Sequence, residues 1–392
     1  MKIAVVFWNL EPERGGNHTF GDVIHEAVLA LAPQTRHELV VYSVGGEPSG
    51  EDGVIRIPHT VPARARRRLI DLWHDIQDRL PVPRFGPRTW FERSLDREGV
   101  DLVWFATHYA EDTDRPYIFT ILDLQHLLQP WFPEVSADGE WGRRQHYFGR
   151  HLLRATRVIV PNKAGEQQLL RHFPIGSERV LRLPHPTPPF ASAAQPLPRS
   201  ALDRFDIEDP YLFYPAQFWA HKNHATVLEA LALLDGDAPN SLQLVLTGSD
   251  KGQLDHVRRL TRELGVVDRV RLLGFVDEAE LVALYQHAHA LVYLSFFGPE
   301  NLPPLEAFAL GCPVIYADVP GALEQLGDAA LLVPPTDAGA VAAAVRDLRD
   351  HDLRERLTAA GRRRSEELSP ARYVRGVLDF VDAFEPVRRT WS

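Results

Sequence analysis

Short apolar runs rich in β-branched residues alternate with amphipathic stretches along almost all of the 392 residues. The runs with the length of strands are residues 3–8, 39–44, 102–106, 117–122, 157–160 and 180–183 in the first half, and 211–215, 242–246, 270–273, 290–294, 314–316 and 330–333 in the second. Helical spacing lies between them, as at Ile24, Ala27, Val28 and Leu31. Strands that alternate with helices form parallel sheets covered on both faces. The pattern therefore predicts two doubly wound, Rossmann-like α/β domains of six strands each.

The two series are separated by residues 184–198, which contain six prolines and no regular period. Because proline removes backbone donors and favours extended chain, this segment predicts a semi-rigid connector. The expected organisation is an N-terminal domain (1–185), a linker (186–200), a C-terminal domain (201–369) and a final helix (370–392) long enough to pack back on the first domain. Ligands of open α/β sheets bind at the carboxyl ends of the strands, so a cleft between the domains is the expected site.

Composition narrows the class of function. The formal net charge of −10 argues against a broad nucleic-acid-binding surface, and a single cysteine excludes both a disulfide framework and a zinc site built on cysteines. No apolar run approaches the length of a bilayer span, and the first run is too short for the core of a signal peptide. We expect a cytoplasmic protein whose membrane contact, if it has any, is peripheral and on the inner face.

Residues 295–314 are the most informative segment. Asn301 is suited to cap a short helix, two prolines suit its first turn, and Gly311 suits its end. A helix N-terminus placed after a strand can bind a phosphate, and Glu306 could then accept hydrogen bonds from two hydroxyls of a nearby sugar. A favourable first-turn acid without a ligand explains Glu306 equally well.

This segment resembles the donor-binding signature of the family 4 retaining glycosyltransferases, which have the GT-B fold. In that signature a glutamate is followed by seven residues and a second glutamate, within Leu-Pro-Pro-Leu-Glu-Ala. Glu306 matches the second glutamate, and the resemblance implies that it binds the ribose hydroxyls of a nucleotide sugar, with Asn301 and Leu302 beside it. Gly298 stands at the first glutamate, which indicates a variant sub-lineage. Glu300, two residues later, is the alternative source of that contact with the transferred sugar.

Residues 214–224 resemble the segment in which the family grips the donor pyrophosphate with an Arg and a Lys. Lys222 matches the Lys, whereas the neutral Gln217 stands where the Arg is expected. The alternative is a solvated loop lysine. It is weakened because the chain has only four lysines and one of them falls on this motif.

Glycines end two predicted strands of the second domain. Gly248 and Gly274 allow a ligand to approach the backbone closely, and the resemblance implies that Gly274, Phe275 and Val276 cradle the base. A plain strand-ending glycine is the simpler explanation for Gly248.

In the first domain, Gly15 and Gly16 follow the first strand and precede a helix, so their backbone N–H groups could face a phosphate. The resemblance implies the donor diphosphate there, with Asn17 and His18 as neighbours. The full Gly-x-Gly-x-x-Gly fingerprint is absent, which argues against a nicotinamide or flavin enzyme.

Asp123 and His126 follow the predicted strand 117–122, at the cleft end of the sheet. Family members often carry His-Asp here; Leu122 occupies the His position and Asp123 matches the Asp. Asp123 or His126 could hydrogen-bond the transferred sugar or take a proton from the acceptor hydroxyl, while a turn-capping role is the alternative for Asp123. No spacing of His and carboxylates suggests a metal site, and the family generally needs none, so we expect no metal and no other cofactor.

A basic cluster, formed by Arg64, Arg66, Arg67 and Arg68, precedes an apolar helical pattern. It could contact anionic lipid or a lipid-linked acceptor, although such runs are more often solvated helix ends.

The sequence therefore predicts a retaining glycosyltransferase. It would move a hexose-type sugar from a nucleotide-diphosphate sugar to a hydroxyl acceptor, which could be a glycan, a lipid-linked sugar or a small molecule. The departures at Gly298, Gln217 and Leu122 leave open a non-catalytic nucleotide-sugar binder or partner subunit. A sugar-nucleotide epimerase is a third interpretation.

Overall fold

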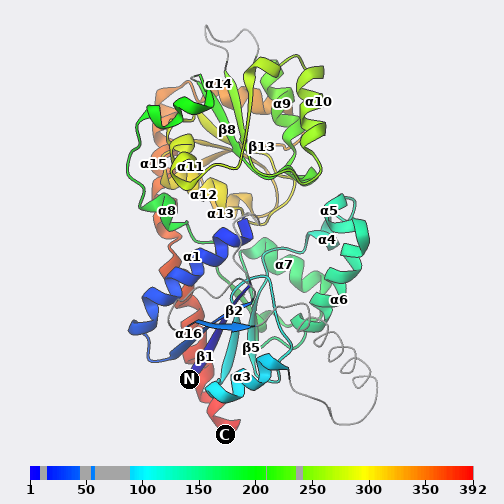
Figure 1. The fold of residues 1–392 in the computed structure, drawn as a ribbon, viewed down its shortest axis with the longest axis vertical. Coiled ribbons are helices and arrows are strands. Elements are labelled where there is room, and N and C mark those ends of the chain that lie inside the picture. The colour runs from blue at the N-terminus through cyan, green and yellow to red at the C-terminus, as the bar shows by residue number, and fades with distance from the viewer. Residues whose placement is uncertain (9–15, 45–53, 58–88, 209, 235–241, 392) are drawn as a thin grey trace.

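In the computed structural model the chain forms two α/β domains stacked end to end, with the N-terminal half below and the C-terminal half above in Figure 1. The structure describes residues 1–8, 16–44, 54–57, 89–208, 210–234 and 242–391, and for residues 16–18 it describes the backbone alone. Both sheets are entirely parallel, so the prediction of two doubly wound, Rossmann-like domains is confirmed.

Within the described residues, the first sheet has seven strands in the order β3-β2-β1-β4-β5-β6-β7. The strands are β1 (Lys2–Trp8), β2 (Glu38–Val44), β3 (Val54–Ile57), β4 (Leu102–Phe105), β5 (Tyr117–Thr120), β6 (Arg157–Val160) and β7 (Val180–Arg182). The helices of this half are α1 (Gly16–Leu31), α3 (Trp90–Glu98), α4 (Gln125–Leu128), α5 (Pro133–Ser136), α6 (Glu140–Leu152) and α7 (Lys163–His172). The expectation of six strands was wrong, because the edge strand β3 was not predicted.

In the described part of the C-terminal half, the second sheet has six strands in the order β10-β9-β8-β11-β12-β13, the number predicted. The strands are β8 (Tyr211–Pro215), β9 (Gln243–Thr247), β10 (Val270–Gly274), β11 (Ala290–Tyr293), β12 (Val314–Ala317) and β13 (Ala330–Val333). The helices are α8 (Pro189–Ser192), α9 (His224–Leu233), α10 (Leu254–Glu263), α11 (Glu278–His287), α12 (Leu302–Ala309), α13 (Ala322–Leu326), α14 (Ala338–Asp347), α15 (His351–Glu367) and α16 (Pro370–Arg388). Every residue of β9, β11 and β12 is buried, as expected for strands covered on both faces.

In the part of the chain that the structure describes, the backbone crosses between the domains twice, and the two crossings touch. Thr187, in the proline-rich connector, donates its backbone N–H to the carbonyl of Leu368 (2.7 Å) and its hydroxyl to the carbonyl of Ser365 (2.9 Å). The second crossing is the short break between α15 and α16, where Ser369 caps α16. Any movement of one domain relative to the other therefore bends the chain at two adjacent points.

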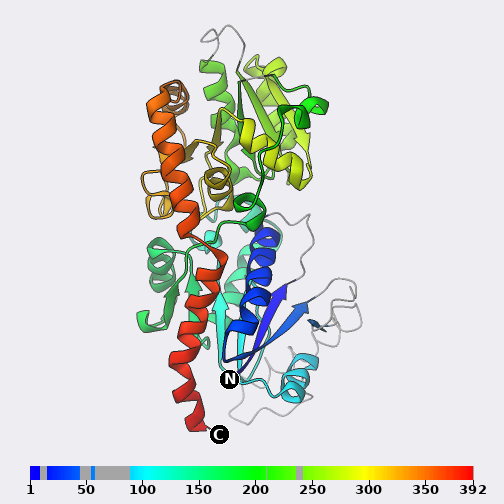
Figure 2. The ribbon, with the colours of Figure 1, turned by 90° about the vertical axis from the view of Figure 1, so that its left-hand side faces the viewer.

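Helix α16 runs along the N-terminal domain, although it follows the whole C-terminal domain in sequence (Figure 2). Tyr373, Val377 and Val381 are buried in one apolar cluster with Ile24 and Val28 of α1. The last helix thus completes the core on one face of the first sheet.

Candidate functional site

A cleft of about 500 Å³ lies between the domains, at the carboxyl ends of strands from both sheets. Thr19 and Phe20 of the first helix line it, as do residues that follow β5, β8, β9, β10 and β11. The structure brings most of the predicted donor-binding residues to this cleft: Gln217, Lys222, Gly248, Gly274, Phe275, Val276, Glu300, Asn301, Leu302 and Glu306. Of the two predicted catalytic residues it brings Asp123 alone.

Among the described residues that line the cleft, the cation from the C-terminal domain is Lys222. Its Nζ donates to the hydroxyl of Tyr293 (2.9 Å) and lies 3.4 Å from Oδ1 of Asn301. Burial lowers the pKa of Lys222 to about 8, because the charged form is poorly solvated there. A bound anion would stabilise the charged form of Lys222 in place of the lost water, so the site is suited to a phosphate.

Asn301 stands at the N-cap of α12, but its side chain does not cap the helix. It donates instead to the hydroxyl of Tyr316 and accepts from Lys222. The prediction of a side-chain cap was therefore wrong, because the side-chain amide of Asn301 is hydrogen-bonded to Tyr316 and Lys222 instead. The backbone N–H of Asn301 donates to Gln325 (3.1 Å).

Glu306 is 6% exposed and lines the cleft from the first turns of α12. Its Oε2 accepts a hydrogen bond from the hydroxyl of Tyr285 (2.6 Å), and burial raises the pKa of Glu306 to about 7. A buried carboxylate with spare acceptor positions can accept further hydrogen bonds from the hydroxyls of a ligand.

Glu300 is held at the junction of the two domains. Its Oε2 accepts from the backbone N–H of His185 (2.6 Å), and its Oε1 lies 3.4 Å from Nδ2 of Asn162. Burial raises the pKa of Glu300 well above its usual range. Both oxygens are thus engaged by the connector and by the N-terminal domain, although the residue borders the cleft.

Gly298 has a backbone conformation that side chains rarely adopt, with φ of +132°. A Cβ there would lie 2.4 Å from Nδ2 of Asn301. The same Asn301 contacts Lys222, so a glutamate at position 298 would displace a residue of the cation site. This conflict gives a physical reason for glycine at the first position of the signature.

The loops after β9 and β10 shape the side of the cleft where the resemblance implies the base. Gly248 has φ of +133°, and a Cβ there would lie 2.4 Å from the carbonyl oxygen of Ala216, so packing of the chain on itself already accounts for this glycine. Gly274 has φ of +70° with open space around the missing Cβ. Phe275 is 75% exposed and borders the cleft, whereas Val276 is buried.

Gln217 borders the cleft with its amide already engaged. Its Nε2 donates to Oγ of Ser249 (3.1 Å), and its Oε1 accepts from the indole N–H of Trp219 (3.0 Å). The side chain is neutral and anchored by its neighbours, so Lys222 supplies the positive charge here.

Asp123 lines the cleft from the N-terminal domain and also caps a turn. Its Oδ1 accepts from the backbone N–H of Gln125 (2.9 Å) and lies 3.5 Å from the guanidinium of Arg144. Burial would raise the pKa of Asp123, but His108, Arg144 and the backbone hydrogen bond together hold it below its usual range. Asp123 is therefore a carboxylate at neutral pH.

His126 does not line the cleft. It is fully buried, its ring stacks on Phe148 at a centroid distance of 5.3 Å, and burial lowers its pKa. The expectation that His126 contacts a substrate was wrong, because adjacent residues of a helical turn point in different directions and its neighbour Gln125 faces the cleft.

Sequence reasoning missed three residues of the cleft: Gln125 and His185, which are buried, and Glu134, whose side chain is 6% exposed. Each has a buried polar atom with no hydrogen-bond partner in the described part of the chain. Glu134 also pairs with His221 across the cleft, through the backbone N–H (3.0 Å) and the ring. No local sequence pattern marks these residues, and the partner of Glu134 lies in the other domain.

Residues 203–364 match the family model described as Glycosyl transferases group 1. Over the whole chain, the structure is similar to that of the sucrose-phosphate synthase of Thermosynechococcus elongatus. The TM-score is 0.71 and the identity 21%, and the match covers 99% of each chain. The chain has the GT-B fold.

Curated relatives of this GT-B chain include the O-antigen chain mannosyltransferase B of Escherichia coli, 29% identical over 224 residues, which are 55% of this chain and 57% of the relative. Another is the D-inositol 3-phosphate glycosyltransferase of Corynebacterium glutamicum (strain R). It is 36% identical over 127 residues, which are 31% of this chain and 30% of the relative. The matches thus span less than two thirds of the length of these relatives.

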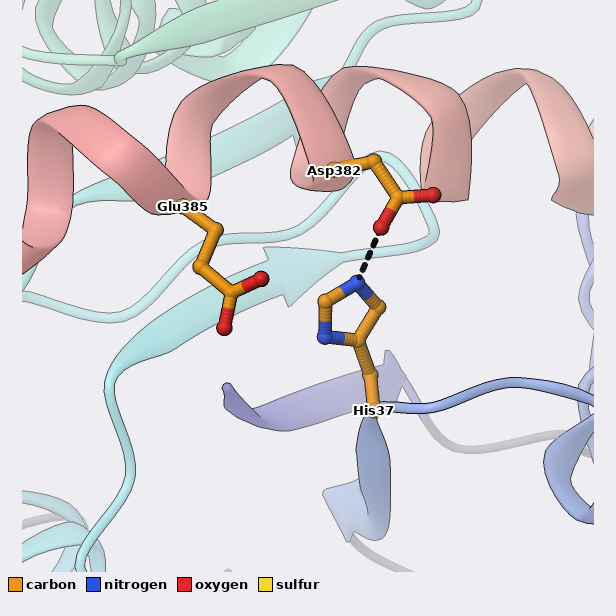
Figure 3. A group of neighbouring side chains, drawn as sticks. All are labelled: His37, Asp382 and Glu385. Carbon is orange, nitrogen blue, oxygen red and sulfur yellow. Dashed lines mark hydrogen bonds and ion pairs between the residues drawn. The ribbon is translucent and has the colours of Figure 1, made fainter.

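Outside the GT-B cleft, one group among the described residues has the geometry to hold a metal ion: His37, Asp382 and Glu385 (Figure 3). Cations already neutralise its carboxylates. Arg36 lies 2.6 Å from Asp382 and 2.9 Å from Glu385, and Arg389 lies 2.8 Å from Glu385. The group is therefore best described as an ion-pair network that fastens α16 to the first domain.

Some predicted contacts fall outside the described residues: Gly15 and the basic cluster Arg64, Arg66, Arg67 and Arg68, while for Gly16, Asn17 and His18 only the backbone is described. Gly16 is the first residue of α1. Within the described part, no helix combines the length and the apolar character needed to cross a bilayer.

Proposed function

We propose that the protein is a retaining glycosyltransferase of the family 4 type, which moves a hexose from a nucleotide-diphosphate sugar to a hydroxyl of an acceptor. The main support is that Lys222 and Glu306 border the same interdomain cleft. Both residues belong to the domain that matches the glycosyl transferase model. One group is suited to a phosphate and the other to vicinal hydroxyls. The names of mannosyltransferases among the relatives support sugar transfer.

In this proposal the C-terminal domain binds the donor. Lys222 neutralises charge on the diphosphate, which grows as the bond to the sugar breaks, so the interaction is strongest in the transition state. Glu306 accepts hydrogen bonds from the ribose hydroxyls, and Phe275 packs against the base. No metal is required, since Lys222 and the N-terminus of α12 supply positive charge to the diphosphate.

The N-terminal domain presents the acceptor. Asp123, a carboxylate in the segment that follows β5, orients the attacking hydroxyl or the transferred sugar. Retention follows when the acceptor attacks from the face that the diphosphate leaves, so that the departing phosphate oxygen takes the proton. Closure of the domains excludes water that would hydrolyse the donor. Gly298 marks a sub-lineage that lacks one glutamate contact with the transferred sugar.

The test is nucleotide release from GDP-mannose, UDP-glucose and ADP-glucose, with and without glycoside acceptors, together with the anomeric configuration of the product. Glu306→Ala and Lys222→Ala are expected to weaken donor binding at least about tenfold, because each removes a charged partner. Glu278→Ala and Lys251→Ala are matched controls, since both residues are described and lie outside the cleft lining.

Wild-type donor affinity and transfer rate in both cleft variants would refute the assignment. A product with inverted configuration would refute retention. The departures at Gly298 and Gln217 also favour a second candidate, a non-catalytic nucleotide-sugar binder. Tight donor binding without turnover on any acceptor would select it.

A further inference from the structure

Two buried side chains on the N-terminal wall of the cleft have polar atoms without partners. Gln125 is 6% exposed, and its Nε2 has no hydrogen-bond partner in the described part of the chain. The side chain of Glu134 is also 6% exposed, and its Oε2 has none. Both residues line the cleft. Buried polar atoms are normally paired, because an unpaired one loses the hydrogen bonds that water would give it, so these two atoms indicate a polar ligand.

The chemistry of the pair is complementary to hydroxyl groups. Nε2 of Gln125 can only donate, and an ionised Glu134 can only accept, whereas a hydroxyl does both. Burial would raise the pKa of Glu134, but its hydrogen bonds, chiefly those from His221, hold the pKa below its usual range. Glu134 is therefore an acceptor at neutral pH.

The orientation of Glu134 is fixed from the opposite domain. Its Oε1 accepts from the backbone N–H of His221 (3.0 Å) and from the ring of the same residue. This leaves Oε2 as the oxygen available to a ligand. The contact forms only when the two domains are together, so the site is complete only in the closed molecule.

The charge on this wall favours an uncharged ligand. Asp123 and Glu134 both have lowered pKa values and carry negative charge. The cation among the described residues of the wall is Arg144, whose guanidinium already lies 2.7 Å from Glu140 and 3.5 Å from Asp123. A phosphate placed here would meet two carboxylates and no free cation in the described lining. Lys222, on the facing wall, is engaged by the donor diphosphate.

We infer that Gln125 and Glu134 form the acceptor subsite, and that it takes a neutral sugar ring rather than a phosphorylated one. The inference rests on the proposed function, since it assigns the donor to the C-terminal domain and leaves the facing wall to the acceptor. The inference distinguishes between a neutral and a phosphorylated acceptor, a choice that the names of the relatives leave open. One relative is named for an O-antigen chain and another for D-inositol 3-phosphate.

The experiment uses the full chain, saturated with whichever of GDP-mannose or UDP-glucose it binds. Methyl α-D-mannoside and methyl α-D-glucoside are each compared with their own 6-phosphates, so that each pair differs by one phosphate. The readouts are acceptor KM and kcat, with donor Kd measured separately by calorimetry. The variants are Glu134→Gln and Gln125→Leu. The control is Gln129→Leu, because Gln129 donates to Phe296 across the domains (2.9 Å) but does not belong to the described cleft lining.

The neutral glycosides are expected to accelerate nucleotide release more than their phosphates do. Glu134→Gln and Gln125→Leu should raise the KM for the neutral glycosides about tenfold or more while donor Kd stays unchanged, which also shows that the variants are folded. The control should leave this KM unchanged.

Three results overturn the inference while donor binding persists: preference for the phosphorylated acceptors, unchanged KM in both variants, or no response to any neutral glycoside. Failure of the wild-type protein to bind any nucleotide sugar would instead refute the proposed function, and the inference with it.

Discussion

Donor affinity is expected to pass through a maximum between about pH 7 and pH 8, because two groups of the cleft must hold opposite charges at once. Glu306, with a pKa raised to about 7, must lose its proton to accept hydrogen bonds from both ribose hydroxyls. Lys222, with a pKa lowered to about 8, must keep its proton to attract the diphosphate. Affinity should therefore rise as pH increases through the pKa of Glu306 and fall as pH increases through that of Lys222.

The size of the effect follows from these two values. At pH 7.5 both groups have the required charge in about 60% of the molecules, whereas at pH 6 about one Glu306 in eleven is ionised. The same fraction of Lys222 is protonated at pH 9. Donor Kd should thus rise about sixfold on either side of the maximum, which corresponds to about 1 kcal/mol.

The assay is calorimetric titration with a nucleotide sugar from pH 6 to pH 9, since its diphosphate diester does not titrate in this range. Glu306→Gln keeps the shape of the side chain and should abolish the acid limb alone. Lys222→Arg should abolish the alkaline limb, because a guanidinium stays charged. A wild-type Kd that does not vary with pH, or an acid limb that survives in Glu306→Gln, would refute the reasoning.

Three further changes test separate parts of the cleft. Phe275→Ala should raise donor Kd about five- to tenfold without changing the melting temperature, because it removes an exposed ring that would stack on the base. An unchanged Kd in the same titration would argue against stacking. Gly298→Ala should lower the free energy of unfolding by about 1–3 kcal/mol, since its Cβ would lie 2.4 Å from Asn301; urea denaturation with a wild-type midpoint would contradict this. His221→Ala should increase the radius of gyration in small-angle scattering, because its ring no longer bonds Glu134; an unchanged radius would show that this contact does not hold the domains together.

Much of the fold could be predicted because buried parallel strands are apolar over their whole length. The missed strand, Val54–Ile57, is short, carries Arg56 and, among the described strands, pairs only with β2, so it lacks that signal. Strand ends were also harder to predict. The run 117–122 suggested a longer strand, but β5 ends at Thr120, and the backbone N–H of Leu122 donates to the ring of His108 (3.1 Å) instead of to a neighbouring strand.

The site was predictable where its residues belong to a local motif. Lys222 and Glu306 lie within short segments whose spacing is readable, and both border the cleft. His126 was assigned wrongly because the turn of α4 directs Gln125, its neighbour, to the cleft. Glu134 could not be found at all, because its partner lies in the other domain and only the folded chain brings the two together.

Because of the position of α16, the two domains are completed in a different order from the one in which they are synthesised. Tyr373, Val377 and Val381 leave the ribosome after the whole second domain, yet they cover apolar residues of α1 and the first sheet. Until they emerge, that face of the N-terminal domain stays open to water and to other chains, as in the aggregation-prone intermediates of multidomain proteins. The first domain to be synthesised is thus the last to be completed. A translation stop just before residue 370 would release a chain with a finished second domain and an unfinished first one.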